Sequence, residues 1–374
     1  MKNLWKWALI LGLGVAFGAA CSAGEDDDDP PPPTYDYYAY VANENSDNIS
    51  AYAINATTGA LTALAGSPFA AGNGSVAIAV DSSAKFAFTA NYQSASVSAF
   101  TINAGTGALT AVPGSPFAAA GGAHSVAVDP SGKFAYAVGI YSTNVYAYAI
   151  NATTGALTAV PGSPFAVGTN PWGVTVDPSG KFAYVANSGS NSISAFTINT
   201  TTGALTAIPG SPFATGSMPY SVAIDPTSKF AYAVNRGVHS ISAYSINAAT
   251  GALTALAGSP FEAGGVDPMA ITIDPSGKFA YVGNTLSDTV SAFAVNATTG
   301  ALTAVPGSPF AAGDGPFSIS VDPSGKFAYV TSYYSDGVSA FSVNATTGAL
   351  TAVPGSPFAA GDGPWEVAAI RIAQ

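Results

Sequence analysis

The sequence contains very few of the side chains that most often carry chemistry. Its 374 residues include one cysteine, Cys21, and two histidines, His124 and His239. A single cysteine excludes a disulfide within the chain, so stability must come from burial and strand pairing. The sequence has no zinc-ligand spacing, phosphate-binding loop or Ser-His-Asp arrangement that would indicate a known site. We therefore predict neither a metal site nor a cofactor.

Charge is also scarce, and most of it is negative. Charged residues make up 8% of the chain, and 10 Lys and Arg stand against 21 Asp and Glu, for a net charge of -11. About a quarter of the residues are charged in an average globular protein. Because nucleic acids and phosphorylated ligands bind to several Lys or Arg donors, we do not expect nucleic acid as a partner.

Long hydrophobic runs are missing as well. The apolar run near the N-terminus, residues 8–17, is too short to span a bilayer as a helix. It follows two lysines and precedes small residues, which predicts an export signal over residues 1–20. The small residues before Cys21 resemble a bacterial lipobox, in which that cysteine becomes the lipidated first residue. An ordinary secretory signal that is cut nearby is the alternative.

Residues 21–35 contain a run of aspartates followed by a run of prolines, which is typical of a solvated tether. With a lipid on Cys21, the membrane is an expected partner. We expect a monomer that is anchored in the bacterial cell envelope, at the outer membrane or the cell surface. Its folded domain would then lie in the periplasm or outside the cell.

Glycine and proline, in contrast, are frequent, with 41 and 26 residues. The string Thr-Gly-Ala-Leu-Thr recurs along the chain, and successive copies are 48 or 49 residues apart. Such a period is typical of a solenoid, a propeller or an array. The glycines of the copies are Gly59, Gly107, Gly155, Gly203, Gly251, Gly300 and Gly348.

Each unit has the pattern of four short antiparallel strands. In one unit, apolar or alternating segments at residues 173–176, 182–187, 192–199 and 203–209 predict these strands. The string Asp-Pro-Ser-Gly before residue 181 suits a type I turn between the first two strands. Four strands per unit and seven units predict an all-β, seven-bladed β-propeller over residues 36–374.

The two ends of this region predict how the ring closes. Residues 38–43 match the second strand of a unit, and residues 365–373 match the strand that should precede it. We therefore expect one blade to combine three N-terminal strands with one C-terminal strand. Such a 3+1 blade removes exposed sheet edges.

The repeat also resembles that of a known family. Residues 184–187 (Tyr-Val-Ala-Asn), 210–213 (Gly-Ser-Pro-Phe) and 177–182 (Asp-Pro-Ser-Gly-Lys-Phe), with the Thr-Gly-Ala-Leu-Thr string, are similar to the lactonase-type seven-bladed propellers with YVTN repeats. The resemblance covers residues 36–374. Enzymes of that family include 6-phosphogluconolactonases and carboxymuconate cyclases, so the resemblance implies a lactonase-like hydrolase.

By the same resemblance, the family site uses a His in a Pro-His-Ser string, an Arg-His pair one blade later and a Glu after the Tyr-x-x-Asn strand. In this chain His124 keeps the first histidine. Trp172 and Gly173 stand in place of the pair, and Ser188 stands in place of the glutamate. The resemblance thus leaves His124 as the one candidate catalytic residue.

Alternating strand directions place the turns on two faces. The bottom face carries the Asp-Pro-Ser-Gly and Asn-Ala-Thr-Thr-Gly turns, which barely change between copies. The top face carries the loops after Tyr-x-x-Asn and after Gly-Ser-Pro-Phe, which vary, as binding loops on a constant frame do. One top position precedes each inner strand and should surround the mouth of the central channel. This mouth ring consists of Val76, His124, Trp172, Tyr220, Met269, Phe317 and Trp365.

We predict a ligand-binding surface on the top face, and plugging of the channel by the same large side chains is the alternative. The predicted ligand-binding residues are Trp172, Tyr220, Arg236, Phe317, Tyr333 and Trp365. The top face also carries many acids, opposed only by Arg236, whereas Asp and Lys balance on the bottom face. The top acids are Glu44, Asp47, Glu262, Asp267, Asp288, Asp314, Asp336, Asp362 and Glu366.

An acidic, aromatic surface favours a neutral glycan, a cation or a basic protein as the ligand. The function that we predict is therefore an envelope-anchored module that binds a glycan or a protein through its top face, without catalysis. The alternative is a lactonase-like hydrolase that uses His124.

Overall fold

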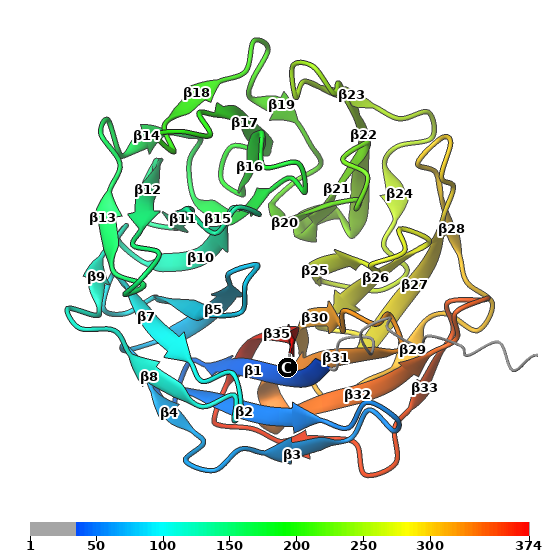
Figure 1. Cartoon of the computed structure of the whole chain (residues 1–374). Coiled ribbons are helices and arrows are strands. Elements are labelled where there is room, and N and C mark those ends of the chain that lie inside the picture. Colours follow the sequence, from blue (N-terminus) through cyan, green and yellow to red (C-terminus); the bar gives the residue numbers. More distant parts are fainter. Residues whose placement is uncertain (1–34, 374) are drawn as a thin grey trace, which may run out of the picture. The chain divides into compact units, whose positions relative to one another are not determined.

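The chain folds into seven antiparallel sheets that stand like blades around a common axis (Figure 1). The computed structural model describes residues 35–373, and of Tyr35 only the backbone. The predicted signal peptide over residues 1–20, the anchor residue Cys21 and the tether as far as residue 34 lie outside the described residues. Within residues 35–373, none of the helices has the length and apolar character needed to cross a bilayer. The predicted all-β, seven-bladed propeller is confirmed.

Strands occupy equivalent positions in every blade. The innermost strands are β5 (Ser75–Val80), β10 (Ala123–Val128), β15 (Pro171–Val176), β20 (Pro219–Ile224), β25 (Pro268–Ile273), β30 (Pro316–Val321) and β35 (Pro364–Ala373). The second strands are β1 (Tyr35–Asn43), β6 (Phe86–Asn91), β11 (Phe134–Gly139), β16 (Phe182–Asn187), β21 (Phe230–Asn235), β26 (Phe279–Asn284) and β31 (Phe327–Ser332). The third strands are β2 (Asn48–Ile54), β7 (Ser96–Ile102), β12 (Asn144–Ile150), β17 (Ser192–Ile198), β22 (Ser240–Ile246), β27 (Thr289–Val295) and β32 (Gly337–Val343).

The outer edge of each blade consists of two short strands. These pairs are β3 (Leu61–Ala63) and β4 (Phe69–Ala70), β8 (Leu109–Ala111) and β9 (Phe117–Ala118), β13 (Leu157–Ala159) and β14 (Phe165–Ala166), β18 (Leu205–Ala207) and β19 (Phe213–Ala214), β23 (Leu253–Ala255) and β24 (Phe261–Glu262), β28 (Leu302–Ala304) and β29 (Phe310–Ala311), and β33 (Leu350–Ala352) and β34 (Phe358–Ala359). Two 3-10 turns, η1 (Arg236–Val238) and η2 (Tyr333–Ser335), lie in top loops.

The blade of β15 to β19 illustrates why the repeat forms these strands. Strand β16 is aromatic and aliphatic and is buried along its whole length, as expected for the middle of a sheet. Asp177 fixes the turn before it, because its Oδ1 accepts hydrogen bonds from the backbone N–H of Lys181 at 2.9 Å and of Phe182 at 2.8 Å. Gly180 in this turn has a φ of 70°, which glycine adopts without strain.

The outer strand of this blade is interrupted by the Gly-Ser-Pro-Phe string. Both β18 and β19 pair with β17, and the residues between them loop away from the ladder. The hydroxyl of Ser211 accepts a hydrogen bond of 2.9 Å from the N–H of Ala195, in place of a strand carbonyl. The single strand predicted over residues 203–209 therefore misses β19, because two residues are too few to show a periodicity.

Neighbouring blades pack through apolar side chains of their second and third strands. Phe182 and Tyr184 of β16 lie in one buried cluster with Tyr244 of the next blade. The Tyr184 hydroxyl donates a hydrogen bond of 2.9 Å to the carbonyl of Gly251, in the Thr-Gly-Ala-Leu-Thr string of that blade. Gly251 has a φ of 73°, and a Cβ there would overlap the Phe182 ring. The recurring glycine thus allows two blades to approach closely.

The closing blade takes strands from both ends of the described region. Strand β35 pairs antiparallel with β1, from Tyr35 opposite Ala373 to Asn43 opposite Pro364. The blade therefore consists of β35 on the inside and of β1, β2, β3 and β4 outside it.

Candidate functional site

Each residue of the mouth ring stands at a β-bulge near the start of an inner strand. In β15, Pro171 pairs with Asn187 and Gly173 pairs with Ala186, so Trp172 is an extra residue outside the ladder. The other inner strands have a register shift at the same place. A bulge turns a side chain away from the plane that the pleat would give it. This geometry brings side chains from all seven blades to one end of the channel.

The aromatic members of the mouth ring contact one another. His124 lies against Trp172, with ring centroids 4.2 Å apart, and Trp172 stacks on Tyr220 at 3.9 Å and 15°. On its other side, the His124 ring meets the edge of Trp365 at 5.2 Å. The ring residues leave a space of only about 90 Å³ between them.

A second group of aromatic rings continues from Trp365. Phe317 contacts Trp365 at 4.7 Å and stacks on Tyr333 at 4.6 Å. Tyr333 is the first residue of η2, outside the mouth ring. The structure thus brings His124 and the five predicted aromatic residues into one cluster, which extends from β10 to η2.

Arg236, the remaining predicted residue, is joined to this cluster by a hydrogen bond to Tyr220 and also forms an ion pair with Asp267. Its Nε donates to Oδ1 of Asp267, and its Nη1 donates a hydrogen bond of 2.8 Å to the Tyr220 hydroxyl. The hydrogen bond to Asp267 raises the pKa of Arg236 further above its usual value, against the effect of burial. Because Asp267 already neutralises the guanidinium, Arg236 positions Tyr220 rather than presenting a free positive charge.

His124 is buried and neutral. Its Nδ1–H donates to the carbonyl of Trp172 at 3.2 Å, which leaves a lone pair on Nε2. That Nε2 is out of contact with solvent and has no hydrogen-bond partner among the described residues. Burial lowers the pKa of His124 to about 4, so the imidazole is uncharged at neutral pH.

A pocket of about 130 Å³ lies beside His124 on the top face. Glu44, Tyr92 and Ile140 line it together with rings of the mouth ring. The Tyr333 hydroxyl donates a hydrogen bond of 2.8 Å to Oε2 of Glu44. Glu44 and Tyr92 were not among the predicted site residues. Their position in the repeat marks them in the sequence, because both directly follow a second strand, as Arg236 and Tyr333 do.

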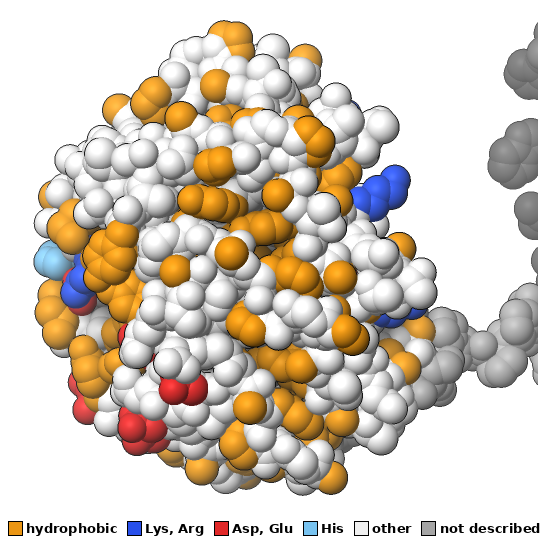
Figure 2. All heavy atoms as spheres, turned by 90° about the vertical axis from the view of Figure 1, so that its left-hand side faces the viewer, with side chains coloured by type: hydrophobic (Ala, Val, Ile, Leu, Met, Phe, Trp, Pro, Cys, Tyr) orange, Lys and Arg blue, Asp and Glu red, His pale blue; other side chains and the backbone are white. Residues whose placement is uncertain are grey.

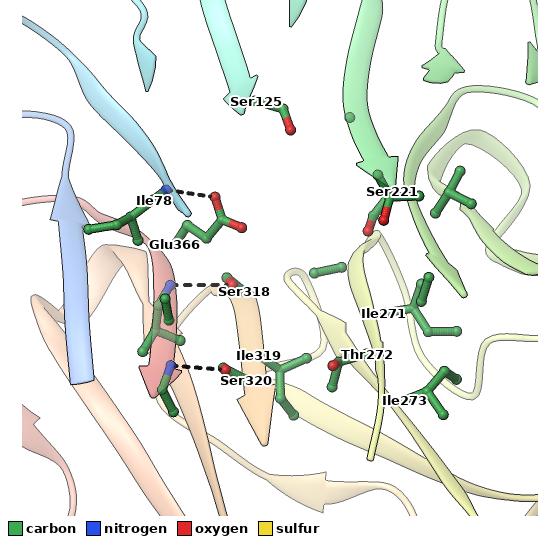
Figure 3. A pocket seen from close by; sticks show the side chains of 18 of the residues that line it. Ile78, Ser125, Ser221, Ile271, Thr272, Ile273, Ser318, Ile319, Ser320 and Glu366 are labelled. Carbon is green, nitrogen blue, oxygen red and sulfur yellow. Dashed lines mark hydrogen bonds between the residues drawn. The ribbon is translucent and has the colours of Figure 1, made fainter. Parts of the chain in front are cut away.

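Glu366 lies inside the channel, and its assignment to the acids of the top face was wrong. It follows the bulge residue Trp365, so the pleat directs its side chain towards the axis (Figure 3). Its Oε2 accepts a hydrogen bond of 3.1 Å from the N–H of Ile78. Removal from bulk water raises the pKa of Glu366 to about 7, and this hydrogen bond opposes the rise.

The two faces differ in charge, as Figure 2 shows at the left and right edges of the molecule. On the top face several acids are turn residues: Asp47, Asp288 and Asp336 have positive φ, and each accepts a hydrogen bond from a glycine N–H. On the bottom face the aspartates are buried in their turns, whereas the lysines are exposed. These exposed lysines are Lys85, Lys133, Lys181, Lys229, Lys278 and Lys326.

Comparisons with known proteins support the family resemblance. The model of the family described as lactonase, 7-bladed beta-propeller, matches residues 34–315 and 267–367. A search of curated proteins finds no match. Among solved structures, a candidate 6-phosphogluconolactonase from Bacteroides uniformis is similar, with a TM-score of 0.77 and 18% identity, and the match covers 90% of this chain and 99% of that chain.

The periplasmic gluconolactonase of Pseudomonas aeruginosa is also similar, with a TM-score of 0.76 and 16% identity over 90% of this chain and 99% of that chain. At these identities the likeness is one of fold. The family match favours the lactonase-like alternative, and the predicted binding module without catalysis receives no support from these comparisons. This chain belongs to the lactonase family of seven-bladed β-propellers.

Proposed function

We propose that the protein hydrolyses a lactone that carries no phosphate group, at the top face beside His124. Membership of the lactonase family supports the reaction type. The observation that carries the choice of residue is the His124 imidazole, which is neutral, has an unpaired Nε2 and belongs to a residue that lines a pocket. A neutral imidazole with a free lone pair is the form that acts as a general base.

In this reaction, Nε2 of His124 takes a proton from a water molecule as the water oxygen bonds to the lactone carbonyl carbon. The ring C–O bond then breaks, and the departing alkoxide recovers the proton from the imidazolium. Water and lactone thus give one hydroxy acid, and His124 is regenerated. Because Nε2 is out of contact with solvent, the ring of Trp172 or Trp365 has to move before substrate reaches it.

The charge of the top face supports a substrate without phosphate. Arg236 is paired with Asp267 there, and the six exposed lysines lie in the bottom turns. A phosphate group binds best where several free cationic donors converge. The pocket beside His124 instead contains Glu44, which would repel a phosphate.

The test is hydrolysis of glucono-δ-lactone by the full-length protein, measured above the spontaneous rate. We expect His124→Ala to lower kcat/KM by about 10²- to 10⁴-fold, the usual contribution of a general base. The intact enzyme should keep a constant kcat/KM from pH 6 to 8 and lose activity only as the pH falls towards 4, where His124 becomes protonated. His239→Gln, which changes the other histidine, is the control and should leave kcat/KM unchanged.

Two results would overturn the proposal. One is the absence of turnover by the intact protein with glucono-δ-lactone. The other is turnover that His124→Ala leaves unchanged, which would assign the chemistry to a different part of the molecule.

A further inference from the structure

The central channel below the mouth ring contains a cavity of about 500 Å³. Its walls are backbone and small, aliphatic or hydroxyl side chains from seven inner strands. Figure 3 shows this interior with Glu366 on the left, Ser125 at the top, and Ser221, Ile271, Thr272 and Ile273 on the right. Glu366 is the one charged residue in the lining that residues 35–373 provide.

Glu366 occupies a position where the other blades have small residues. The equivalent residues are Ala77, Ser125, Gly173, Ser221, Ala270 and Ser318. Two of these serines link inner strands of adjacent blades, because Ser125 Oγ accepts from Val174 N–H at 3.2 Å and Ser318 Oγ accepts from Val367 N–H at 3.5 Å. Glu366 Oε2 makes the same kind of link to Ile78.

A serine is therefore sufficient for the structural role of Glu366. What the glutamate adds is a second oxygen, Oε1, and a negative charge. Figure 3 shows this second oxygen directed into the channel, away from Ile78. A carboxylate removed from bulk water is costly unless it is protonated or lies beside a positive charge, and the described lining contains no Lys or Arg to supply one.

The chemistry of the lining indicates which cation would fit. Calcium takes six to eight oxygen ligands, usually including several carboxylates. The described residues contain no group of three or more His, Cys, Asp or Glu that could hold a metal ion. Hydroxyls of Ser125, Ser221 and Thr272 can accept hydrogen bonds from an ammonium group, while Ile271 and Ile319 provide apolar contacts for an alkyl chain.

We propose that the channel binds a small organic ammonium ion, whose amine donates to the free oxygen of Glu366. Hydroxyls of the channel lining accept the remaining N–H groups, and the aliphatic walls cover the carbon chain. This site is distinct from the pocket beside His124, and it does not depend on the proposed hydrolysis of a lactone.

Binding should compete with protonation of Glu366. No other titratable side chain from β5, β10, β15, β20, β25 or β30 faces the 500 Å³ cavity, and His124 and Tyr220 lie above it, at the neck. His124 is neutral, because burial lowers its pKa to about 4. The pKa of Glu366, raised to about 7, therefore sets the pH range in which the ammonium ion competes with a proton.

The experiment is calorimetric titration of the full-length protein with propylammonium chloride. We expect saturable binding at pH 8 and a dissociation constant about tenfold larger at pH 6, since Glu366 is then mostly protonated. Glu366→Gln keeps an acceptor for Ile78 N–H and should abolish the binding. Asp314→Asn removes one exposed acid outside the channel and is the matched control for net charge, so it should bind as the intact protein does.

Several outcomes would overturn the proposal. They are the absence of binding at pH 8, equal binding by Glu366→Gln, and an affinity that does not change between pH 6 and 8. Saturable binding of Ca²⁺ that depends on Glu366, with no response to propylammonium, would replace the organic ligand with a metal ion. Equal binding of 1-propanol would show that the positive charge is not recognised.

Discussion

The same phenol hydrogen bond recurs between adjacent blades, with one exception. Tyrosines in the middle of the second strands donate to the carbonyl of the recurring glycine in the next blade, and the Phe88 ring takes this place in one blade. The bonded pairs are Tyr40 and Gly107 at 2.7 Å, Tyr136 and Gly203 at 3.1 Å, Tyr184 and Gly251 at 2.9 Å, Tyr232 and Gly300 at 2.8 Å, Tyr281 and Gly348 at 3.0 Å, and Tyr329 and Gly59 at 3.0 Å.

This exception provides a matched pair of substitutions. Tyr184→Phe leaves the Gly251 carbonyl without its donor in a buried place, and we expect a loss of about 1–3 kcal/mol in the free energy of unfolding. Phe88→Tyr supplies the missing donor to Gly155 and should raise stability by about 1 kcal/mol. Urea unfolding measures both. Equal stability of Tyr184→Phe and the intact protein would mean that the hydroxyl does not hold the blades together.

At the residue scale, the sequence predicted the aromatic cluster at the channel mouth but not how the charged residues near it are placed. The repeat register was sufficient to assemble His124, Trp172 and Trp365 at one end of the channel. It did not separate Glu366 from the top acids, because the bulge at Trp365 decides which way the next side chain points, and a bulge leaves no mark in a single strand pattern. It also did not pair Arg236 with Asp267, since these residues belong to loops of different blades.

At the scale of the element, the interrupted outer strand depends on a side chain rather than on the backbone. Ser211 Oγ accepts the hydrogen bond from Ala195 N–H, and the equivalent serine does so in every blade. The loop between β18 and β19 would otherwise leave a gap in the ladder of β17. The Ser in the Gly-Ser-Pro-Phe string therefore recurs for a structural reason.

We expect Ser211→Ala to lower the free energy of unfolding by about 1–2 kcal/mol, because Ala195 N–H loses its acceptor. Thr206→Ala in β18 is the control, since the Thr206 side chain is exposed, and its effect should stay within about 0.5 kcal/mol. Chemical denaturation of both variants makes the comparison. A loss in Thr206→Ala as large as in Ser211→Ala would show that the strand, not the hydroxyl, determines the effect.

Most elements could be predicted because their signals repeat. The apolar and aromatic segment at residues 182–187 and the turn at Asp177 recur in unit after unit, so a weak local pattern becomes a strong one. The short strands are different. Strand β19 follows from the pairing with Ser192 and Ile193, which depends on tertiary structure.

For the whole molecule, the pairing of β35 with β1 joins the two ends of the described region. Deleting residues 364–374 would remove the inner strand of one blade and leave one edge of β1 unpaired. We expect the truncated chain to lose its cooperative thermal transition, measured by circular dichroism. As a control, the same residues can be moved in front of Tyr35 and joined to it by an Asp-Pro-Ser-Gly-Lys turn, which should restore the transition.

A truncated chain that unfolds as cooperatively as the intact protein would contradict this role for β35. Failure of the rearranged control to fold, together with loss of the transition in the truncated chain, would show that the connection matters as well as the strand.

The sequence thus predicted the ring of seven blades best and the contacts of the candidate site residues least. Seven copies of a unit determine the ring, because each blade buries its neighbours' apolar faces in the same way. The two proposed sites rest on residues that break the repeat, His124 and Glu366, and each of these breaks occurs only once. The sequence shows where such breaks lie but not what they contact.

The bulge at the start of each inner strand has a consequence for how the sequence of this protein can evolve. Trp172 and its six counterparts lie outside the backbone ladder, so we expect their substitution to leave strand pairing intact. The scaffold and the channel mouth can therefore vary independently. A library of variants restricted to these seven positions would explore new specificities while retaining one stable frame.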